Sequence, residues 1–293
     1  MTIQPARALI TGCAQNCAAD LPNVLHNIEV LRNLCSSSRV LLLENDSSDH
    51  TATVIRDYAN KNRDVHALAF PGLNQRIPGK TVRLAHLRNT ALHWLEANGG
   101  WASIDWLVVL DLDAVNAAPW NPDQLQNALS WWQEQPDAAG LFANQLGPYY
   151  DLWALRHPSL CSNDVWAAML HLHAEQPELS DAELMAAVLE PRRFQLDPGA
   201  HPLEVNSAFG GLGIYSSRWL AQSGARYCGE HPLQWHGPQG SRWLRWQCCE
   251  HVALHERLRS AGGRLWIHPA LINWDTRQGQ RPNPSSWRHL ALA

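Results

Sequence analysis

The sequence has little of what marks a nucleic-acid-binding or membrane-spanning protein. No block of Lys or Arg is longer than a pair, and the 293 residues carry a formal net charge of −4. A general surface for nucleic acid or for an anionic membrane is therefore not expected, because such surfaces need clustered positive charge. No apolar run reaches the length of a membrane span, and the start, MTIQPARALITG, lacks the basic segment and apolar core of a signal peptide.

The sequence also lacks a cysteine framework. Its seven cysteines are an odd number and form no repeated C-x-x-C pair, which favours reduced thiols over disulfides. We therefore expect a cytoplasmic protein, whose association with the inner membrane, if it has one, is peripheral. The length allows one large domain or one and a half. Fifteen tryptophans are a weak indication of sugar binding, because large cores and interfaces use Trp as well.

An apolar run in the middle of the chain ends in two carboxylates. Residues 106–116 read WLVVLDLDAVN, and the run from Trp106 to Leu110 is short and β-prone, which predicts a central strand buried on both faces. Side chains two apart in an extended chain point the same way, so Asp111 and Asp113 should face one spot at the carboxyl end of the sheet. Open α/β sheets bind their ligands there.

Two neighbouring carboxylates are costly unless a cation lies between them. Oxygen ligands suit Mg²⁺ or Mn²⁺ better than Zn²⁺, and two carboxylates leave octahedral positions open for a diphosphate. The alternative is that Asp111-Leu112-Asp113 only closes a strand and solvates a turn. Its place after a buried strand in mid-chain favours the metal site.

Alternating strand and helix patterns precede this stretch. The expected strands are Arg7 to Gly12, Arg39 to Glu44 and Val65 to Phe70, and amphipathic helical patterns follow the first two. Three β-α repeats that lead to the strand at 106 predict an α/β fold with a mixed, mainly parallel sheet and helices on both faces. Asn121 followed by Pro122 predicts a helix start, and Gly140 to Asn144 is a further expected strand.

Two arginines lie on the helix expected around residues 84–95. Arg88 is at the edge of its apolar stripe and Arg83 is about one turn earlier. An Arg on the inner side of a helix needs an anionic partner. That partner is either an internal Asp or Glu, or a phosphate or a carboxylate of the metal site, and both possibilities stay open.

The second half is harder to interpret. Residues 161–200 have a polar helical pattern with Ser180 and Glu183 spaced as a capping box, and residues 226–249 predict an irregular loop. In the last helix His251 and His255 have the spacing of a zinc pair, but the Glu of H-E-x-x-H is missing, so we expect them at the helix surface or as caps. His268 ends a short strand that begins at Arg264.

The order of these parts resembles GT-A glycosyltransferases, and the resemblance covers about residues 7–270. The motifs that carry it are ALITGC, LLLENDSSDHT, RLAHLRNTAL and VVLDLDAV. More narrowly, RLAHLRNTAL, YYDLWALR, NSAFGGLGIYSS and CEHVALHERL are similar to the cryptococcal capsule mannosyltransferase family, glycosyltransferase family 69, and its bacterial relatives. This implies one GT-A-like domain over residues 1–293, with a nucleotide-sugar-binding half (1–118) and an acceptor-binding half (119–293) that carries a helical insertion at about 161–200.

The resemblance implies roles for individual residues. Asp111 and Asp113 would bind Mn²⁺ or Mg²⁺ with His268 as the third ligand, and Glu250 would face the acceptor, with Asp113 and Glu250 as the catalytic pair. The residues implied in donor binding are Thr11, Gly12, Glu44, Asp46, Arg83, Arg88 and Asp111. Within the acceptor-half motifs we assign acceptor binding to Tyr150, Asp151, Trp153, Asn206, Gly210 and Gly211.

The expected substrates are a nucleotide-diphosphate sugar, with GDP-mannose implied by the resemblance, and a glycan or small hydroxyl acceptor. Charge that develops on the leaving oxygen would be stabilised by the metal ion and nearby Arg. If the reaction inverts C1, Glu250 would deprotonate the acceptor; if it retains, the departing phosphate oxygen would take the proton. The alternatives are a nucleotidyltransferase, a non-catalytic carbohydrate-binding protein and, from the abundance of histidine, a zinc hydrolase. The oligomeric state cannot be derived from the sequence.

Overall fold

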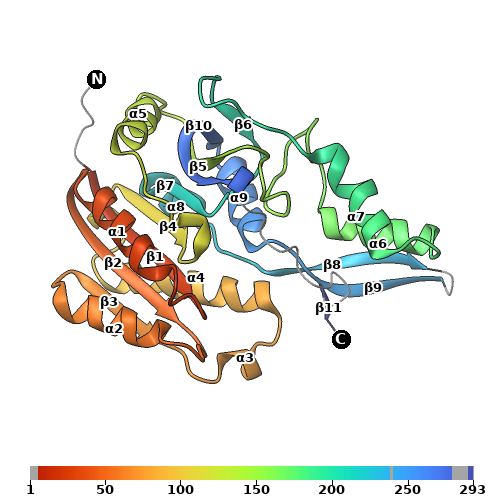
Figure 1. Ribbon diagram of the computed structural model, residues 1–293, viewed down its shortest axis with the longest axis horizontal. Helices are drawn as coiled ribbons and strands as arrows, with labels where there is room; N and C mark the ends of the chain where they lie inside the picture. Colours follow the sequence, from red (N-terminus) through yellow and green to blue (C-terminus); the bar gives the residue numbers. More distant parts are fainter. Residues whose placement is uncertain (1–5, 238–239, 279–289, 293) are drawn as a thin grey trace.

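The computed structural model describes residues 6–237, 240–278 and 290–292. Within these residues, eight strands form one sheet in the order β3-β2-β1-β4-β7-β5-β10-β6 (Figure 1). Its strands are β1 (Ala6–Ala14), β2 (Cys35–Glu44), β3 (Val65–Ala69), β4 (Trp106–Asp111), β5 (Ala138–Leu146), β6 (Leu203–Val205), β7 (Leu212–Ser216) and β10 (Arg264–Asp275).

The sheet is mixed and mainly parallel, as predicted. Among its neighbouring strands in the described residues, four pairs are parallel, β1 with β2, β1 with β4, β2 with β3 and β5 with β10. The other three, β4 with β7, β5 with β7 and β6 with β10, are antiparallel. The apolar run that ends at Asp111 is the central strand β4, which lies between β1 and β7, and its first five residues are buried.

Helices cover both faces of the sheet. Successive strand residues point to opposite faces, so the apolar strands present side chains that need covering on each side. Leu9 of β1 belongs to a core with α4 and α9, whereas Ile10 belongs to a second core with α1 and α5. The helices are α1 (Leu21–Arg32), α2 (Thr51–Lys61), α3 (Leu73–Arg76), α4 (Lys80–Ala97), α5 (Pro122–Gln133), α6 (Val165–Glu175), α7 (Asp181–Leu189), α8 (Ser217–Ser223) and α9 (Glu250–Ser260). Short 3₁₀ helices are η1 (Trp101–Ser103), η2 (Ala114–Asn116), η3 (Glu190–Arg192) and η4 (Thr276–Gln278).

Several helices begin where their capping residues predict. Asn121 accepts hydrogen bonds from the N–H groups of Asp123 and Gln124 ahead of Pro122, so α5 starts there. Ser180 and Glu183 form the reciprocal capping box of α7. The segment 161–200, for which a helical insertion is expected, contains helices α6 and α7. Helix α6 contacts β8 (Figure 1).

The expectation of an irregular loop at 226–249 is wrong. This segment contains a β-hairpin of β8 (Glu230–Gly237) and β9 (Gly240–Gln247), which pairs with β11 (Ala291–Leu292) in a second sheet. Trp246 is fully buried at the base of the hairpin, while Trp243 on its outer face is exposed. Partly buried and exposed residues alternate along β8 from His231 to His236, but they do not alternate along β9, so the sequence of the hairpin shows no clear two-residue period.

In the described part of the chain, the longest helices are too polar or too short to cross a lipid bilayer.

Candidate active site

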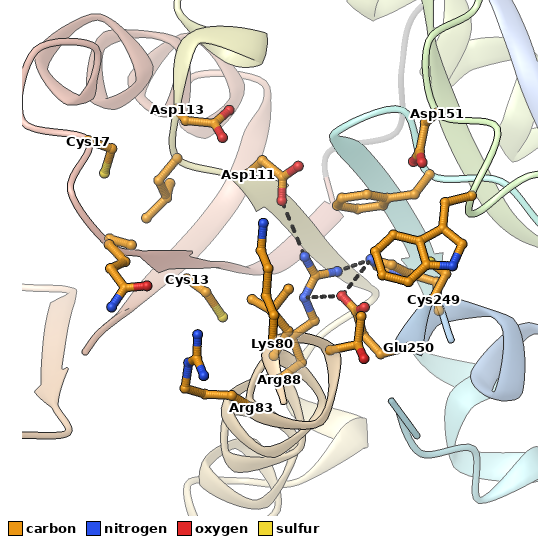
Figure 2. Close-up of a pocket in the computed structure, with 18 of the residues that line it drawn as sticks. Cys13, Cys17, Lys80, Arg83, Arg88, Asp111, Asp113, Asp151, Cys249 and Glu250 are labelled. Carbon is orange, nitrogen blue, oxygen red and sulfur yellow. Dashed lines mark hydrogen bonds and ion pairs between the residues drawn. The ribbon is translucent and has the colours of Figure 1, made fainter. Parts of the chain in front are cut away.

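A cavity of about 260 Å³ lies at the carboxyl ends of β1 and β4, next to the first turns of α4 and α9 (Figure 2). This is the edge at which open α/β sheets bind ligands. The residues that line it are Cys13, Ala14, Gln15, Cys17, Asn45, Lys80, Thr81, Arg83, Leu84, Arg88, Asp111, Leu112, Asp113, Tyr150, Asp151, Trp153, Phe209, Cys249, Glu250 and His251.

The two acids of the central motif both line this cavity, as their spacing predicts. Asp111 is the last residue of β4, and its side chain is 25% exposed. Asp113 caps η2, because its Oδ1 accepts a hydrogen bond from the N–H of Val115 at 3.2 Å. Carboxylate oxygens are ligands that Mg²⁺ and Mn²⁺ prefer, so the chemistry of the pair agrees with a divalent ion, and the metal site itself stays a prediction.

The expected third ligand, His268, is not at this site. Strand β10 does not end near His268 but continues to Asp275, and its pairing with β5 is irregular between Ile267 and Ile272. In that irregular stretch the His268 ring lies 5.4 Å from the ring of Trp131, and burial lowers its pKa to about 4. Over residues 6–237, 240–278 and 290–292, no three His, Cys, Asp or Glu side chains are grouped to hold a metal ion, so the predicted trio is not assembled.

Arg88 connects the acids at the two ends of the cavity. Its NH2 atom lies 3.2 Å from Oδ1 of Asp111 and its Nε lies 3.5 Å from Oε1 of Glu250. Its NH1 atom donates a hydrogen bond to Nε2 of His251, and the guanidinium carbon lies 4.8 Å from the centre of the Phe209 ring. Arg88 therefore pairs with two carboxylates of the chain, one of which, Asp111, belongs to the predicted metal site, and its contact with a phosphate stays a prediction.

Burial and neighbouring charge have opposite effects on the pKa values of Arg88 and Glu250. The Arg88 side chain is 5% exposed, and although burial lowers its pKa, the carboxylates of Glu250 and Asp111 raise it above the ordinary value. Burial raises the pKa of Glu250, and the charge of Arg88 only partly offsets this. Glu250 is therefore a carboxylate that binds a proton more readily than an exposed one does.

Two further cations line the cavity from α4. Lys80 is the first residue of this helix, and its exposed side chain extends toward the strand end that carries Asp111 (Figure 2). Arg83 donates hydrogen bonds to the backbone oxygens of Ile77 at 2.8 Å and Pro78 at 3.2 Å, which holds it beside the cavity. The sequence reasoning missed Lys80, although a Lys that directly follows Pro-Gly at a helix start is a signal for anion binding.

Four of the residues assigned to the donor do not line the cavity. Strand β1 runs on to Ala14, so Thr11 is buried in its middle and a Cβ atom on Gly12 would lie 2.7 Å from the backbone oxygen of Leu110. The residues at the cavity are Cys13 to Gln15, one to three positions later. The strand boundary, which sequence patterns define poorly, decided this error.

Glu44 and Asp46 fix loops instead of lining the cavity. Glu44 accepts a hydrogen bond from the N–H of Ser47, and Asp46 accepts hydrogen bonds from the N–H groups of Gly72 and Asn74. Asp46 has a positive φ of 50°, and between these two acids Asn45 lines the cavity. Their role in donor binding stays a prediction.

Of the residues assigned to acceptor binding, some line the cavity and others do not. Tyr150, Asp151 and Trp153 line the cavity. Gly210 does not, but its N–H donates to Oδ2 of Asp151 at 3.0 Å. Gly211, with a φ of 84°, accepts a hydrogen bond from the N–H of Asp111 at 2.9 Å, so the glycine turn holds both acids in place.

Asn206 lies outside the lining, and its N–H donates to the backbone oxygen of Arg156 at 2.7 Å.

The expectation that His251 and His255 are surface or capping residues is wrong. They are 1% and 0% exposed, because this side of α9 packs against the sheet, where the His255 ring lies 4.9 Å from that of Phe142. His251 also lines the cavity. Their one-turn spacing was visible in the sequence, but not the face of the helix that is buried.

No protein-family model matches the sequence, and neither does any curated protein. Membership in glycosyltransferase family 69 therefore stays a prediction.

Three solved structures illustrate what the chain is similar to. The mannosyltransferase PcManGT from Pyrobaculum calidifontis, in complex with GDP-Man and Mn²⁺, aligns with a TM-score of 0.49 at 17% identity over 93% of this chain and 57% of that one. S. aureus TarS 1–349 aligns with a TM-score of 0.48 at 13% identity over 92% and 60% of the two chains. Glucosyl-3-phosphoglycerate synthase from Mycobacterium tuberculosis, with Mn²⁺, UDP and phosphoglyceric acid, gives 0.42 at 15% over 95% and 72%.

The chain thus spans less than two thirds of the first two of these proteins. A likeness of this degree establishes neither a family nor a function, which have to be argued from the cavity.

Proposed function

We propose that this protein is a metal-dependent glycosyltransferase that moves a sugar from a nucleotide-diphosphate sugar to a hydroxyl acceptor. The observation that carries the proposal is the composition of the cavity. It combines the oxygen donors of Asp111 and Asp113 with the cations Lys80 and Arg83 and a buried carboxylate, Glu250. A leaving diphosphate, a divalent ion and an acceptor hydroxyl need these three kinds of group.

The donor diphosphate binds between the acid pair and α4. Asp111 and Asp113 would hold Mn²⁺ or Mg²⁺, which neutralises charge on the diphosphate when it is bound. Lys80 and Arg83 bind the phosphate oxygens directly, and the positive end of the α4 dipole adds to their effect. The nucleoside lies against Cys13 to Gln15 and Asn45, which form the neighbouring wall. GDP-mannose is the first donor to test, on the strength of the sequence resemblance to the capsule mannosyltransferase family.

The acceptor enters from the side of Tyr150, Asp151 and Trp153. Aromatic faces beside a carboxylate suit a sugar acceptor, since the ring packs on the aromatic surface and the hydroxyls donate to the acid. In this division residues 1–118 supply most of the donor site and residues 119–293 the acceptor site.

Glu250 acts on the acceptor hydroxyl. In the reaction the bond between sugar C1 and the diphosphate oxygen breaks and a bond between C1 and the acceptor oxygen forms. If C1 is inverted, Glu250 takes the hydroxyl proton, and burial has already raised its pKa toward that role. If the configuration is retained, the departing phosphate oxygen takes the proton and Glu250 positions the acceptor. The anomeric configuration of the product, read by NMR, distinguishes the two routes.

The test is a thermal-shift screen of GDP, UDP, CDP and ADP with and without Mn²⁺. A ligand well above its dissociation constant raises the melting temperature by mass action. We expect one nucleoside diphosphate to stabilise the protein in a metal-dependent way, and Asp113→Ala to abolish the effect. Asp57→Ala, an exposed position on α2, is the matched control and should behave as wild type.

The same screen, repeated with Mg²⁺ and with the corresponding nucleoside triphosphates, separates the competing functions. If no nucleotide stabilises the wild type with any metal ion, the transferase proposal is wrong and a carbohydrate-binding protein takes its place. Stabilisation by a nucleoside triphosphate with release of pyrophosphate would instead identify a nucleotidyltransferase.

A further inference from the structure

A chain of buried hydrogen bonds lies behind the cavity, and the proposed reaction does not use it. It begins at Arg88 on α4, which donates to Nε2 of His251. Nδ1 of His251 lies 3.2 Å from the hydroxyl oxygen of Tyr215, and the same oxygen lies 2.9 Å from Nε2 of His255. Nδ1 of His255 lies 2.8 Å from Oγ of Ser207. The chain thus connects α4, α9, β7 and the segment before the glycine turn.

All the groups between its ends are buried and neutral. His251, Tyr215, His255 and Ser207 are at most 1% exposed. Burial, followed by the positive charge of Arg88, lowers the pKa of His251 well below 6.5 and that of His255 to about 3. Both imidazoles therefore carry one proton each at neutral pH, so each has one donor and one acceptor nitrogen.

The guanidinium sets the direction of the whole chain. Arg88 can only donate, so Nε2 of His251 accepts and the single proton of this ring is on Nδ1. That proton is donated to the Tyr215 oxygen. The Tyr215 hydroxyl also interacts with the hydroxyl of Tyr227, but that oxygen is outside hydrogen-bond geometry, whereas Nε2 of His255 lies at 2.9 Å, so we assign the Tyr215 proton to His255. The proton of His255 is consequently on Nδ1 and is donated to Ser207.

The chain is not built to carry protons out of the site. It ends at Ser207, which is 1% exposed, and it starts at a guanidinium, which does not give up its proton in proteins. Its effect is therefore on position. Three nitrogens of Arg88 face three different partners, Asp111, Glu250 and His251, so a rotation of the guanidinium would displace both carboxylates together.

We propose that Tyr215, through His251 and His255, fixes the orientation of Arg88, and that Arg88 in turn holds the carboxylates of Asp111 and Glu250 at the separation that the reaction needs. Tyr215 is a positioning residue in this scheme, because it touches neither donor nor acceptor. The hydrogen-bond chain follows from the geometry of the protein alone, whereas its effect on turnover rests on the proposed function.

The first experiment examines the chain without using activity. Nitrogen-15 NMR of histidine-labelled protein reports which ring nitrogen carries the proton. We expect His251 and His255 to be neutral and protonated on Nδ1 between pH 5 and pH 8, and Tyr215→Phe to shift the Nε2 signal of His255 and the Nδ1 signal of His251. A wild-type protein with His255 protonated on Nε2, or with either ring positively charged at pH 6, would overturn the proposed direction.

The second experiment measures turnover with the nucleotide sugar that the thermal-shift screen identifies. Tyr215→Phe keeps the ring, which packs 5.7 Å from that of Phe142, and removes only the hydroxyl. We expect kcat to fall by about 10-fold to 100-fold with little change in the donor KM, since a small misplacement of reacting groups acts on the transition state. Unchanged kcat in a variant whose histidine signals have shifted would show that the chain exists but positions nothing.

Two further variants test whether a loss of kcat in Tyr215→Phe is caused only by destabilisation of the fold. Tyr58→Phe makes the same chemical change in the core on the other face of the sheet, where the Tyr58 hydroxyl donates a hydrogen bond to Glu29, and it should leave kcat unchanged. Ser207→Ala removes only the last acceptor of the chain, so it should shift the Nδ1 signal of His255 and lower kcat less than Tyr215→Phe does. If Tyr58→Phe lowers kcat as much as Tyr215→Phe, general destabilisation explains both and the positioning role is refuted.

Discussion

Replacing Arg88 by Met removes the cation that lies between Asp111 and Glu250. Met keeps much of the apolar length of the side chain, so the variant measures the contribution of the guanidinium group separately from that of the apolar stem. In the variant Glu250 is a buried carboxylate without its counter-charge, Nε2 of His251 loses its donor, and Asp111 loses a partner at 3.2 Å. Breaking one buried ion pair costs about 3–5 kcal/mol, so we expect a loss of that size in the free energy of unfolding at pH 7.

The loss should depend on pH with a defined sign. Without Arg88, the largest influence that opposes burial at Glu250 is removed, so the pKa of Glu250 in the folded state rises further above the unfolded value of 4.5. Between these two pKa values the folded state binds more protons than the unfolded state, so stability falls as pH rises. The difference between Arg88→Met and wild type should therefore be smaller at pH 5 than at pH 8.

Urea denaturation at both pH values, followed by tryptophan fluorescence, measures this difference. Arg7→Met is the matched control: it breaks an exposed Arg–Asp pair with Asp105 at 2.8 Å, so its loss should be much smaller and nearly independent of pH. Arg88→Lys keeps the positive charge but cannot reach three partners at once, so its loss should lie between the two. An Arg88→Met variant that loses less than about 1 kcal/mol, or equally at pH 5 and pH 8, would refute the account of the buried cluster.

Three further predictions concern the cavity. Glu250→Gln should bind the donor with wild-type affinity, measured by calorimetry, but its transfer rate should fall about 100-fold or more, as expected when a general base is removed. Equal losses in donor affinity and in transfer rate would assign Glu250 to donor binding. Lys80→Ala should weaken binding of the stabilising nucleoside diphosphate about 10-fold through one lost charge-assisted hydrogen bond, whereas Lys61→Ala on α2 should not. Burial raises the pKa of Cys13 to about 12, so iodoacetamide at pH 8 should modify exposed Cys228 long before the partly exposed Cys13, as measured by mass spectrometry; fast modification of Cys13 would show that the pKa of its thiol is not raised.

Much of the fold could be predicted from local patterns. The apolar run before Asp111 is the central strand, and helix α5 begins at the predicted Asn-Pro signal. These features depend on side-chain period and capping, which involve neighbours in the sequence. The pairing of Asp111 and Asp113 on one cavity follows from the same period.

The incorrect predictions concern strand ends, where the same local sequence pattern is compatible with more than one strand boundary. The carboxyl end of β1 was placed two residues early, and this moved the donor wall from Cys13 to Thr11. His268 was placed at a strand end, although β10 continues past it to Asp275. Strand length is set by pairing with distant strands, and an apolar pattern alone does not show where that pairing stops.

The sequence by itself determined the alternating α/β order, the central strand and the two acids at its end. Only the tertiary structure decided which charges meet: Arg88 and His251 are 163 residues apart in the chain, and Arg88 and Asp111 are 23 apart. It also decided that His251 and His255 are buried and that Lys80 faces the acid pair. The physical reason is that a helix pattern shows which residues share a face, whereas the packing of helix on sheet decides what that face contacts.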